Sequence, residues 1–152
     1  MSQSTCDVDP EVLQKLRKFR FSKRSQKGSA AFVHELMLDG LFCFQVKIDR
    51  ERLCIVEDEV HDEITIEDLV EELPETSPRY IVLSYELTHN DGRKSYPLVL
   101  IYYAPVSTKP ELHMLYASAK TYFQQRADIN KVFDIREAET LSDEWLQEKL
   151  LS

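Results

Sequence analysis

The sequence lacks long hydrophobic runs and is poor in glycine. No stretch of its 152 residues approaches the roughly 20 consecutive apolar residues that span a bilayer. Its first residues, MSQSTCDVDPEV, also lack the basic and apolar pattern of a signal peptide. With three glycines in all, the chain has no Gly-rich phosphate loop. We therefore expect no membrane insertion and no secretion, and we expect a cytoplasmic protein.

Cysteine is also scarce, and its three copies follow no ligand spacing. Cys6, Cys43 and Cys54 form an odd set without a Cys-x-x-Cys pair, which fits neither a disulfide framework nor a zinc site. Cys43 and Cys54 lie in apolar, strand-like runs and are expected to be small core residues. The four histidines are scattered and no nucleophile motif is present. We expect no metal, no cofactor and no catalysis; only His113 beside Glu111 could be imagined as a catalytic base.

The formal net charge of -8 argues against broad nucleic-acid binding, but the charges are unevenly distributed. Ten acidic residues and no Lys or Arg lie between positions 53 and 78, a pattern typical of a solvated face. Seven basic residues and no acidic one lie between positions 15 and 27. A docking patch and a solvated face are equally supported there, and phosphoinositide binding is one form that such a patch could take. The residues proposed for this basic patch are Arg17, Lys18, Arg20, Lys23 and Arg24.

Apolar residues at helical spacing, with capping signals before them, predict the helices. Asp9 as N-cap and Pro10 at the first helical position start a helix near residue 10. Residues 65–73 form a short helix that Thr65 can cap. A longer helix covers residues 111–126 after Pro110, and the last begins near Ser142.

Runs rich in aromatic and β-branched residues predict strands over 42–48, 52–57, 79–89, 95–105 and 131–136. The links DRE and NDGRK predict hairpins, and Gly92 tolerates the positive φ that such a turn needs. The run LVLIYY is apolar throughout, which favours a central strand covered on both faces. We expect a single α+β domain over residues 1–152, with a central mixed sheet flanked by helices on both faces. Residues 26–41 could be an extra strand, a short helix or an irregular loop.

The predicted helix 111–126 places a methionine outside its apolar face. At about 100° per residue, one face gathers Leu112, Leu115, Tyr116, Ala119, Tyr122 and Phe123. The opposite side gathers Met114, Ala117, Ser118, Thr121 and Gln125, with His113 and Lys120 on one flank. An exposed methionine among small residues lets another surface approach closely. A stray surface methionine explains the feature equally well on this pattern alone.

Two motifs resemble the actin-depolymerising-factor homology family: the triplet Tyr103-Ala104-Pro105 at a strand end, and the helical run from Met114 to Lys120. Longer blocks are similar to the glia maturation factor subfamily, nearly end to end. These blocks are VLQKLRKFRF, ELPETSPRYIVLSYELTHNDGRKSYPL, KPELHMLYASAK, KVFDIR and LSDEWLQEKL. They leave out mainly residues 26–41, where this chain has an unusual inserted segment.

The resemblance implies a binding protein whose long helix enters the barbed-end cleft of actin or an actin-related subunit, with Met114 inside the cleft. For this subfamily it implies binding to the actin-related protein 2/3 complex, dissociation of actin branches and inhibition of branched nucleation. Depolymerising factors usually carry lysines before the methionine and late in the helix, where this chain has His113 and the run FQQR. We therefore expect a monomer with weak or no actin-monomer binding. The alternative is a depolymerising factor that severs filaments.

The resemblance implies two further functional regions. The hairpin with Asn90, Asp91, Arg93 and Lys94 is expected to approach the first actin subunit of a daughter filament, although Asp91-Gly92 is also simply a good turn. Arg93 and Lys94 are the residues of this hairpin whose charged side chains the turn itself does not require. Ser2 matches a regulatory serine region, where a phosphate would place negative charge beside the helix contact. The expected location is the actin-rich cortex or patches, with the nucleus as an alternative.

Overall fold

A six-stranded mixed sheet forms the centre of the protein, in the order β1-β3-β2-β4-β7-β8. The structure is a computed structural model that describes residues 6–17, 41–85, 87–89, 91–95 and 97–151. The β1–β3 and β7–β8 pairs are parallel, and the other neighbours in the sheet are antiparallel. The strands are β1 (Asp7–Val8), β2 (Leu41–Asp49), β3 (Cys54–Ile64), β4 (Arg79–Ser84), β7 (Leu98–Tyr103) and β8 (Lys131–Ile135).

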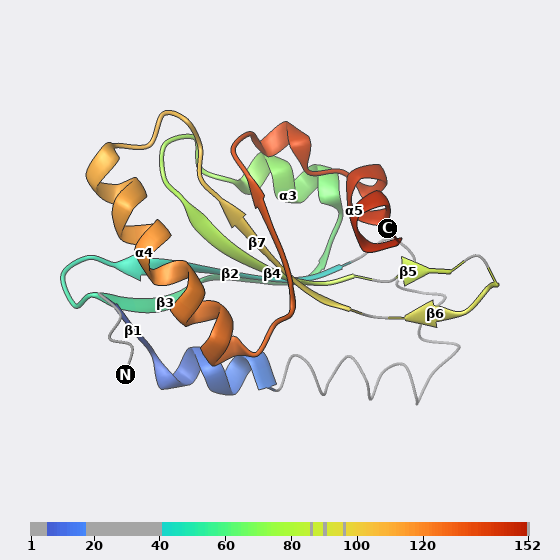
Figure 1. Cartoon of the computed structure of the whole chain (residues 1–152), viewed down its shortest axis with the longest axis horizontal. Helices are drawn as coiled ribbons and strands as arrows, with labels where there is room; N and C mark the ends of the chain where they lie inside the picture. Colours follow the sequence, from blue (N-terminus) through green and yellow to red (C-terminus); the bar gives the residue numbers. More distant parts are fainter. Residues whose placement is uncertain (1–5, 18–40, 86, 90, 96, 152) are drawn as a thin grey trace.

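Helices cover both faces of this sheet (Figure 1). A helix over residues 10–17 and α4 (Pro110–Ala127) pack on one face, while α3 (Ile66–Glu72) and α5 (Asp143–Leu151) pack on the other. The alternation of strand side chains explains the two layers. In β4, Tyr80 and Val82 face α4, whereas Ile81 and Leu83 belong to the opposite core. The predicted sandwich, and a central strand buried on both faces, are confirmed.

The capping residues act as the sequence predicts. The Asp9 carboxylate accepts a hydrogen bond from the backbone N–H of Glu11 at 3.0 Å, at the start of the helix over residues 10–17. Thr65 accepts one from the N–H of Asp68 at 3.1 Å and starts α3. Helix α4 begins at Pro110, and α5 follows Ser142, whose hydroxyl accepts from the N–H of Trp145.

The strands differ from the prediction at several points. Strand β3 continues to Ile64, past the predicted end at residue 57, because antiparallel pairing with β2 continues through the acidic run. The predicted strands 79–89 and 95–105 each divide in two, since β5 (Leu87–Thr88) and β6 (Lys94–Ser95) form a separate two-stranded sheet. Strand β1 was not predicted, because two residues carry no periodic signal.

Some predictions concern positions that the structure does not describe or places differently. Cys43 is fully buried as predicted, whereas Cys54 is only half-buried beside the short strand β1, so its assignment to the core was wrong. Predictions for Ser2, Lys18, Arg20, Lys23, Arg24 and Asn90 lie outside the described residues, as does the 26–41 segment except for Leu41, which starts β2.

Candidate functional site

Helix α4 is fixed on the sheet by a cluster of aromatic rings. The Tyr80 ring stacks on Phe123 with centroids 5.2 Å apart and lies 5.4 Å from the ring of Tyr116. The Tyr80 hydroxyl donates to the backbone carbonyl of Tyr116, and the Tyr116 hydroxyl accepts from the N–H of Ile48 at 3.0 Å. These bonds join α4 to β4 and β2. They set the rotation of the helix about its axis, and hence which side chains face outward.

The outward face of α4 is the one that helical periodicity predicts. Met114 is 70% exposed, in contrast to Tyr116, Ala119 and Phe123 on the buried side. The other members of the predicted face that are exposed are Ala117, Ser118, Thr121 and Gln125, while His113 is half-buried. The Ser118 hydroxyl donates to the carbonyl of Leu115 at 2.8 Å, one turn back in the same helix. The face therefore presents one long apolar side chain among small, uncharged ones.

Lys120 lies on the flank of that face and points towards the sheet. Its ammonium group is 2.8 Å from the Asp134 carboxylate on β8 and 5.6 Å from the centre of the Tyr102 ring. The side chain is only 25% exposed. Lys120 therefore links α4 to β8. Its positive charge is less available to a partner than the helical pattern alone suggests.

Hydrogen bonds join the described residues at the tip of the hairpin formed by β5 and β6. Gly92 adopts a φ of 90°, and its N–H donates to the carbonyl of His89 at 2.9 Å. The Arg93 side chain forms an ion pair with Asp91 at 2.7 Å, and the backbone N–H of Arg93 donates to the same carboxylate. Hydrogen bonds from the backbone and side chain of Arg93 lower the pKa of Asp91. In the isolated protein the Arg93 guanidinium group is thus paired within the turn, and the Arg93 side chain stays largely exposed.

The structure keeps the two candidate surfaces apart. Figure 1 shows the β5–β6 hairpin projecting beyond one end of the central sheet, away from α4. Of the proposed basic patch, the described part of the chain includes Arg17, which is exposed at the last described position of the first helix. Residues 6–17, 41–85, 87–89, 91–95 and 97–151 contain no cluster of His, Cys, Asp and Glu able to hold a metal ion. No helix within those same ranges is long and apolar enough to cross a membrane.

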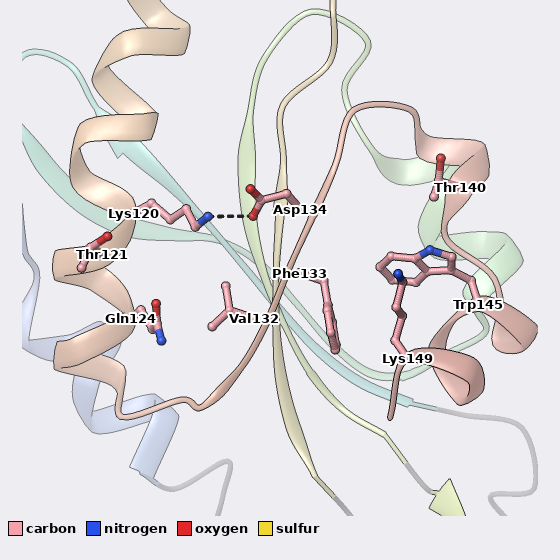
Figure 2. Close-up of a pocket in the computed structure, with 9 residues that line it drawn as sticks. All are labelled: Lys120, Thr121, Gln124, Val132, Phe133, Asp134, Thr140, Trp145 and Lys149. Atoms are coloured by element: carbon pink, nitrogen blue, oxygen red, sulfur yellow. Dashed lines mark hydrogen bonds and ion pairs between the residues drawn. The ribbon is translucent and has the colours of Figure 1, made fainter. Parts of the chain in front are cut away.

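Sequence reasoning missed a groove of about 580 Å³ beside β8. Figure 2 shows side chains of α4 on one side, side chains of α5 and the segment before it on the other, and β8 between them. Val132 packs with the core under α4, whereas Phe133 packs with the core under α5. The groove therefore wraps around the edge of the sheet. No periodicity within one element could have found it, because several separate elements form it.

Comparisons with known proteins identify the class to which this fold belongs. The family described as "Cofilin/tropomyosin-type actin-binding protein" matches residues 5–151. Human glia maturation factor beta is 44% identical over 152 residues, which cover 99% of this chain and 97% of that protein. The glia maturation factor of Drosophila melanogaster is 40% identical over 145 residues, with 95% of each chain covered.

Solved structures of similar proteins support the same assignment. The solution structure of glia maturation factor from Caenorhabditis elegans has a TM-score of 0.73 at 34% identity, covering 98% of this chain and 99% of that one. The crystal structure of a cofilin from Streptomyces griseoflavus has the same TM-score at 17% identity, over 95% and 96% of the two chains, and so shares the fold. The chain belongs to the cofilin-type family of actin-binding proteins. Within that family it is similar to the glia maturation factors over nearly its whole length, and it regulates actin by binding rather than by catalysis.

Proposed function

We propose that the outer face of α4 binds the actin-related protein 2/3 complex, and that this binding promotes debranching of actin filaments and inhibits branched nucleation. The observation that carries the proposal is the 70% exposure of Met114 on a helix whose opposite face is fixed in the core. A flexible thioether side chain that enters a partner's cleft leaves water and adapts its shape to the pocket. Ala117 and Ser118 beside it allow the two backbones to approach closely.

The charge of this face favours the branching complex over actin monomers. His113 precedes Met114, and Gln125 occupies the late turn where actin-binding relatives were expected to carry lysines. The nearby cation Lys120 is paired with Asp134. Attraction to an acidic actin surface is therefore weak, and affinity depends on shape and apolar contact. The similarity to glia maturation factors supports the same choice of partner.

Debranching requires the protein to bind one state of the junction more tightly than another. A ligand shifts an equilibrium only by the difference between its affinities for the two states. We assign α4 to the complex, and the hairpin tip with Arg93 and Lys94 to the first actin subunit of the daughter filament. Because Arg93 is paired with Asp91 in the isolated protein, contact with actin would exchange that partner for an acidic group on the filament. Binding at both surfaces would then favour the loosened junction.

The proposal also includes how binding is regulated and where in the cell the protein acts. Ser2 lies outside the described residues, and we propose that a phosphate on it adds negative charge that weakens partner binding. The protein acts as a cytoplasmic monomer at the actin-rich cortex or in patches, with the nucleus as an alternative location. The basic patch that includes Arg17 is a candidate for phosphoinositides, whose binding could coexist with either actin-related function.

One comparison of partners tests the proposal against the alternative of a filament-severing depolymerising factor. Purified branching complex is captured on immobilised protein, and filamentous actin is separately pelleted with the protein in solution. Capture of the complex with little co-pelleting supports the proposal. Strong co-pelleting without capture of the complex would assign the chain to the severing class instead.

A further inference from the structure

Strand β8 lies at an edge of the central sheet. It pairs with β7 on one side, and within the described residues no strand pairs with its other side. An edge strand presents unpaired N–H and C=O groups and is a template for another strand. In Figure 1 this edge lies between α4 and α5, and Figure 2 shows the side chains that surround it.

The hydrogen bonding of β8 identifies which backbone groups face outward. The carbonyl of Ile135 accepts from the N–H of Ala104, so the backbone groups of Ile135 point towards the β7 side. Because alternate residues of a strand point their backbone groups to opposite sides, those of Phe133 also face β7. The N–H and C=O groups of Val132 and Asp134 therefore face the open edge.

The groove provides surfaces for the side chains of an added strand. Such a strand would lie about 4.8 Å beyond β8, and its side chains would alternate between the two faces of the sheet. On one face they would meet half-buried Val132 and the flank of α4. On the other they would meet Phe133 and Trp145, whose rings are in edge-to-face contact with centroids 5.7 Å apart. The volume of about 580 Å³ is within the usual range of binding clefts.

The charged side chains of the groove indicate which kind of peptide strand would bind there. Lys120 lies on the α4 side and Lys149 on the α5 side, where the Lys149 ammonium sits 5.9 Å from the centre of the Trp145 ring. Asp134 supplies the acidic charge of the lining and is already paired with Lys120. The lining thus holds two cationic side chains and one anionic one, in a chain whose net charge is -8. An acidic segment is attracted here and repelled by most of the remaining surface.

We propose that the outer edge of β8 binds an extended acidic segment of a partner protein as an additional strand. The segment pairs with the backbone of Val132 and Asp134, places an apolar side chain against Phe133 and Trp145, and places a carboxylate near Lys149. The groove does not include Met114, although its lining takes in Lys120 and Thr121 from α4. It gives the protein a second attachment site beside the α4 face.

The experiment uses the full chain and a display library of random peptides about eight residues long, the length of an ordinary strand. Peptides selected on the unmodified protein are measured against Lys149→Glu and, as a matched charge reversal, against Lys109→Glu, an exposed residue before α4 and outside the groove. We expect acidic peptides that bind the unmodified protein and Lys109→Glu equally. Lys149→Glu should bind them about tenfold more weakly. Met114→Ala should bind them normally, which separates this site from the proposed function.

Two readouts test for strand pairing itself. Bound peptide should slow amide hydrogen exchange at Val132 and Asp134, and change Phe133 little because its N–H already faces β7. Of two peptides N-methylated along opposite edges, only the one whose methyl groups face β8 should lose binding. Selection of no acidic peptide, or unchanged exchange at Val132 and Asp134, would overturn the proposal. So would self-association or binding to anionic vesicles that Lys149→Glu abolishes, since the occupant would then be a second copy or a lipid.

Discussion

Met114 and Tyr116 are two residues apart on α4 and face opposite ways. Tyr116 is 2% exposed, and its hydroxyl accepts a hydrogen bond from Ile48, whereas Met114 is 70% exposed. A separation of two residues is about 200° of helical rotation, so burial of one exposes the other. The same contacts that stabilise α4 on the sheet therefore present the methionine to a partner. Stability and binding depend on different residues of one helix.

Replacing Met114 with Ala should separate these two roles. We expect the midpoint of thermal unfolding to stay near that of the unmodified protein, because the side chain lies outside the core. Affinity for the branching complex should fall by about 1–3 kcal/mol if the side chain is an interface anchor. Val106→Ala is the matched control, since Val106 is equally exposed but lies in the loop before α4. A stability loss with unchanged affinity would contradict the proposed role of the methionine.

Binding to actin monomers should be weak or undetectable. The face around Met114 lacks the lysines expected of a monomer binder, and Lys120 is paired with Asp134. A fluorescence titration with labelled monomeric actin measures this directly, with a cofilin as positive control. Tight binding at one-to-one stoichiometry would favour the depolymerising-factor alternative.

Two tyrosines beneath α4 should respond differently to loss of their hydroxyl groups. The Tyr80 hydroxyl donates to the carbonyl of Tyr116, so Tyr80→Phe should lower the free energy of unfolding by about 0.5–1.5 kcal/mol. In the described part of the chain, the Tyr102 hydroxyl is buried without a hydrogen-bond partner. Tyr102→Phe should therefore leave the stability near neutral pH unchanged or slightly higher. Denaturant unfolding of both variants checks the pair, and equal losses would contradict the difference.

The raised pKa of Tyr102 also leads us to expect a loss of stability at alkaline pH. Burial, assisted by the Asp134 carboxylate, raises the pKa of Tyr102 from 10.0 to about 12. The folded protein holds this proton more tightly than the unfolded chain. The stability that this tighter proton binding contributes to the folded protein is thus fully present below pH 10, and it is lost as the pH rises through about 12. We expect the free energy of unfolding to fall across this window, and to fall less steeply in Tyr102→Phe. Parallel slopes in the two proteins would show that the pKa of Tyr102 is not raised.

The sequence predicts the outer face of α4 well because that face depends on local geometry. Once residues 111–126 are helical, a period of 3.6 determines that Met114 and Phe123 face opposite sides. The capping residues Asp9 and Thr65 are equally local signals. The sandwich follows from one further step, since a strand that is apolar at every position needs cover on both faces.

Features that depend on strand order were not predictable in this way. The groove beside β8 exists because β8 lies at the sheet edge between α4 and α5, and no pattern within residues 131–136 records that position. The pairing of Lys120 with Asp134 joins two elements in the same manner. The length of β3 was missed because its acidic residues lower the local strand propensity, whereas pairing with β2 stabilises the strand.

The hairpin should affect debranching without affecting attachment to the free complex. Arg93→Ala combined with Lys94→Ala removes positive charge from the tip, while Asp91 and Gly92 are kept so that the turn is preserved. The Arg93–Asp91 pair is exposed at both side chains, so its loss should hardly change stability.

We expect the double variant to bind the free branching complex normally, because α4 makes that contact, and to remove branches more slowly in a microscopy assay. Asp91→Asn is the informative companion, because it weakens the hold on Arg93 but keeps a side-chain oxygen for the turn. If Arg93 must leave Asp91 to reach the filament, this variant should remove branches at least as fast as the unmodified protein. If the double variant removes branches at the rate of the unmodified protein, the hairpin is only a turn. The α4 surface then remains as the candidate site.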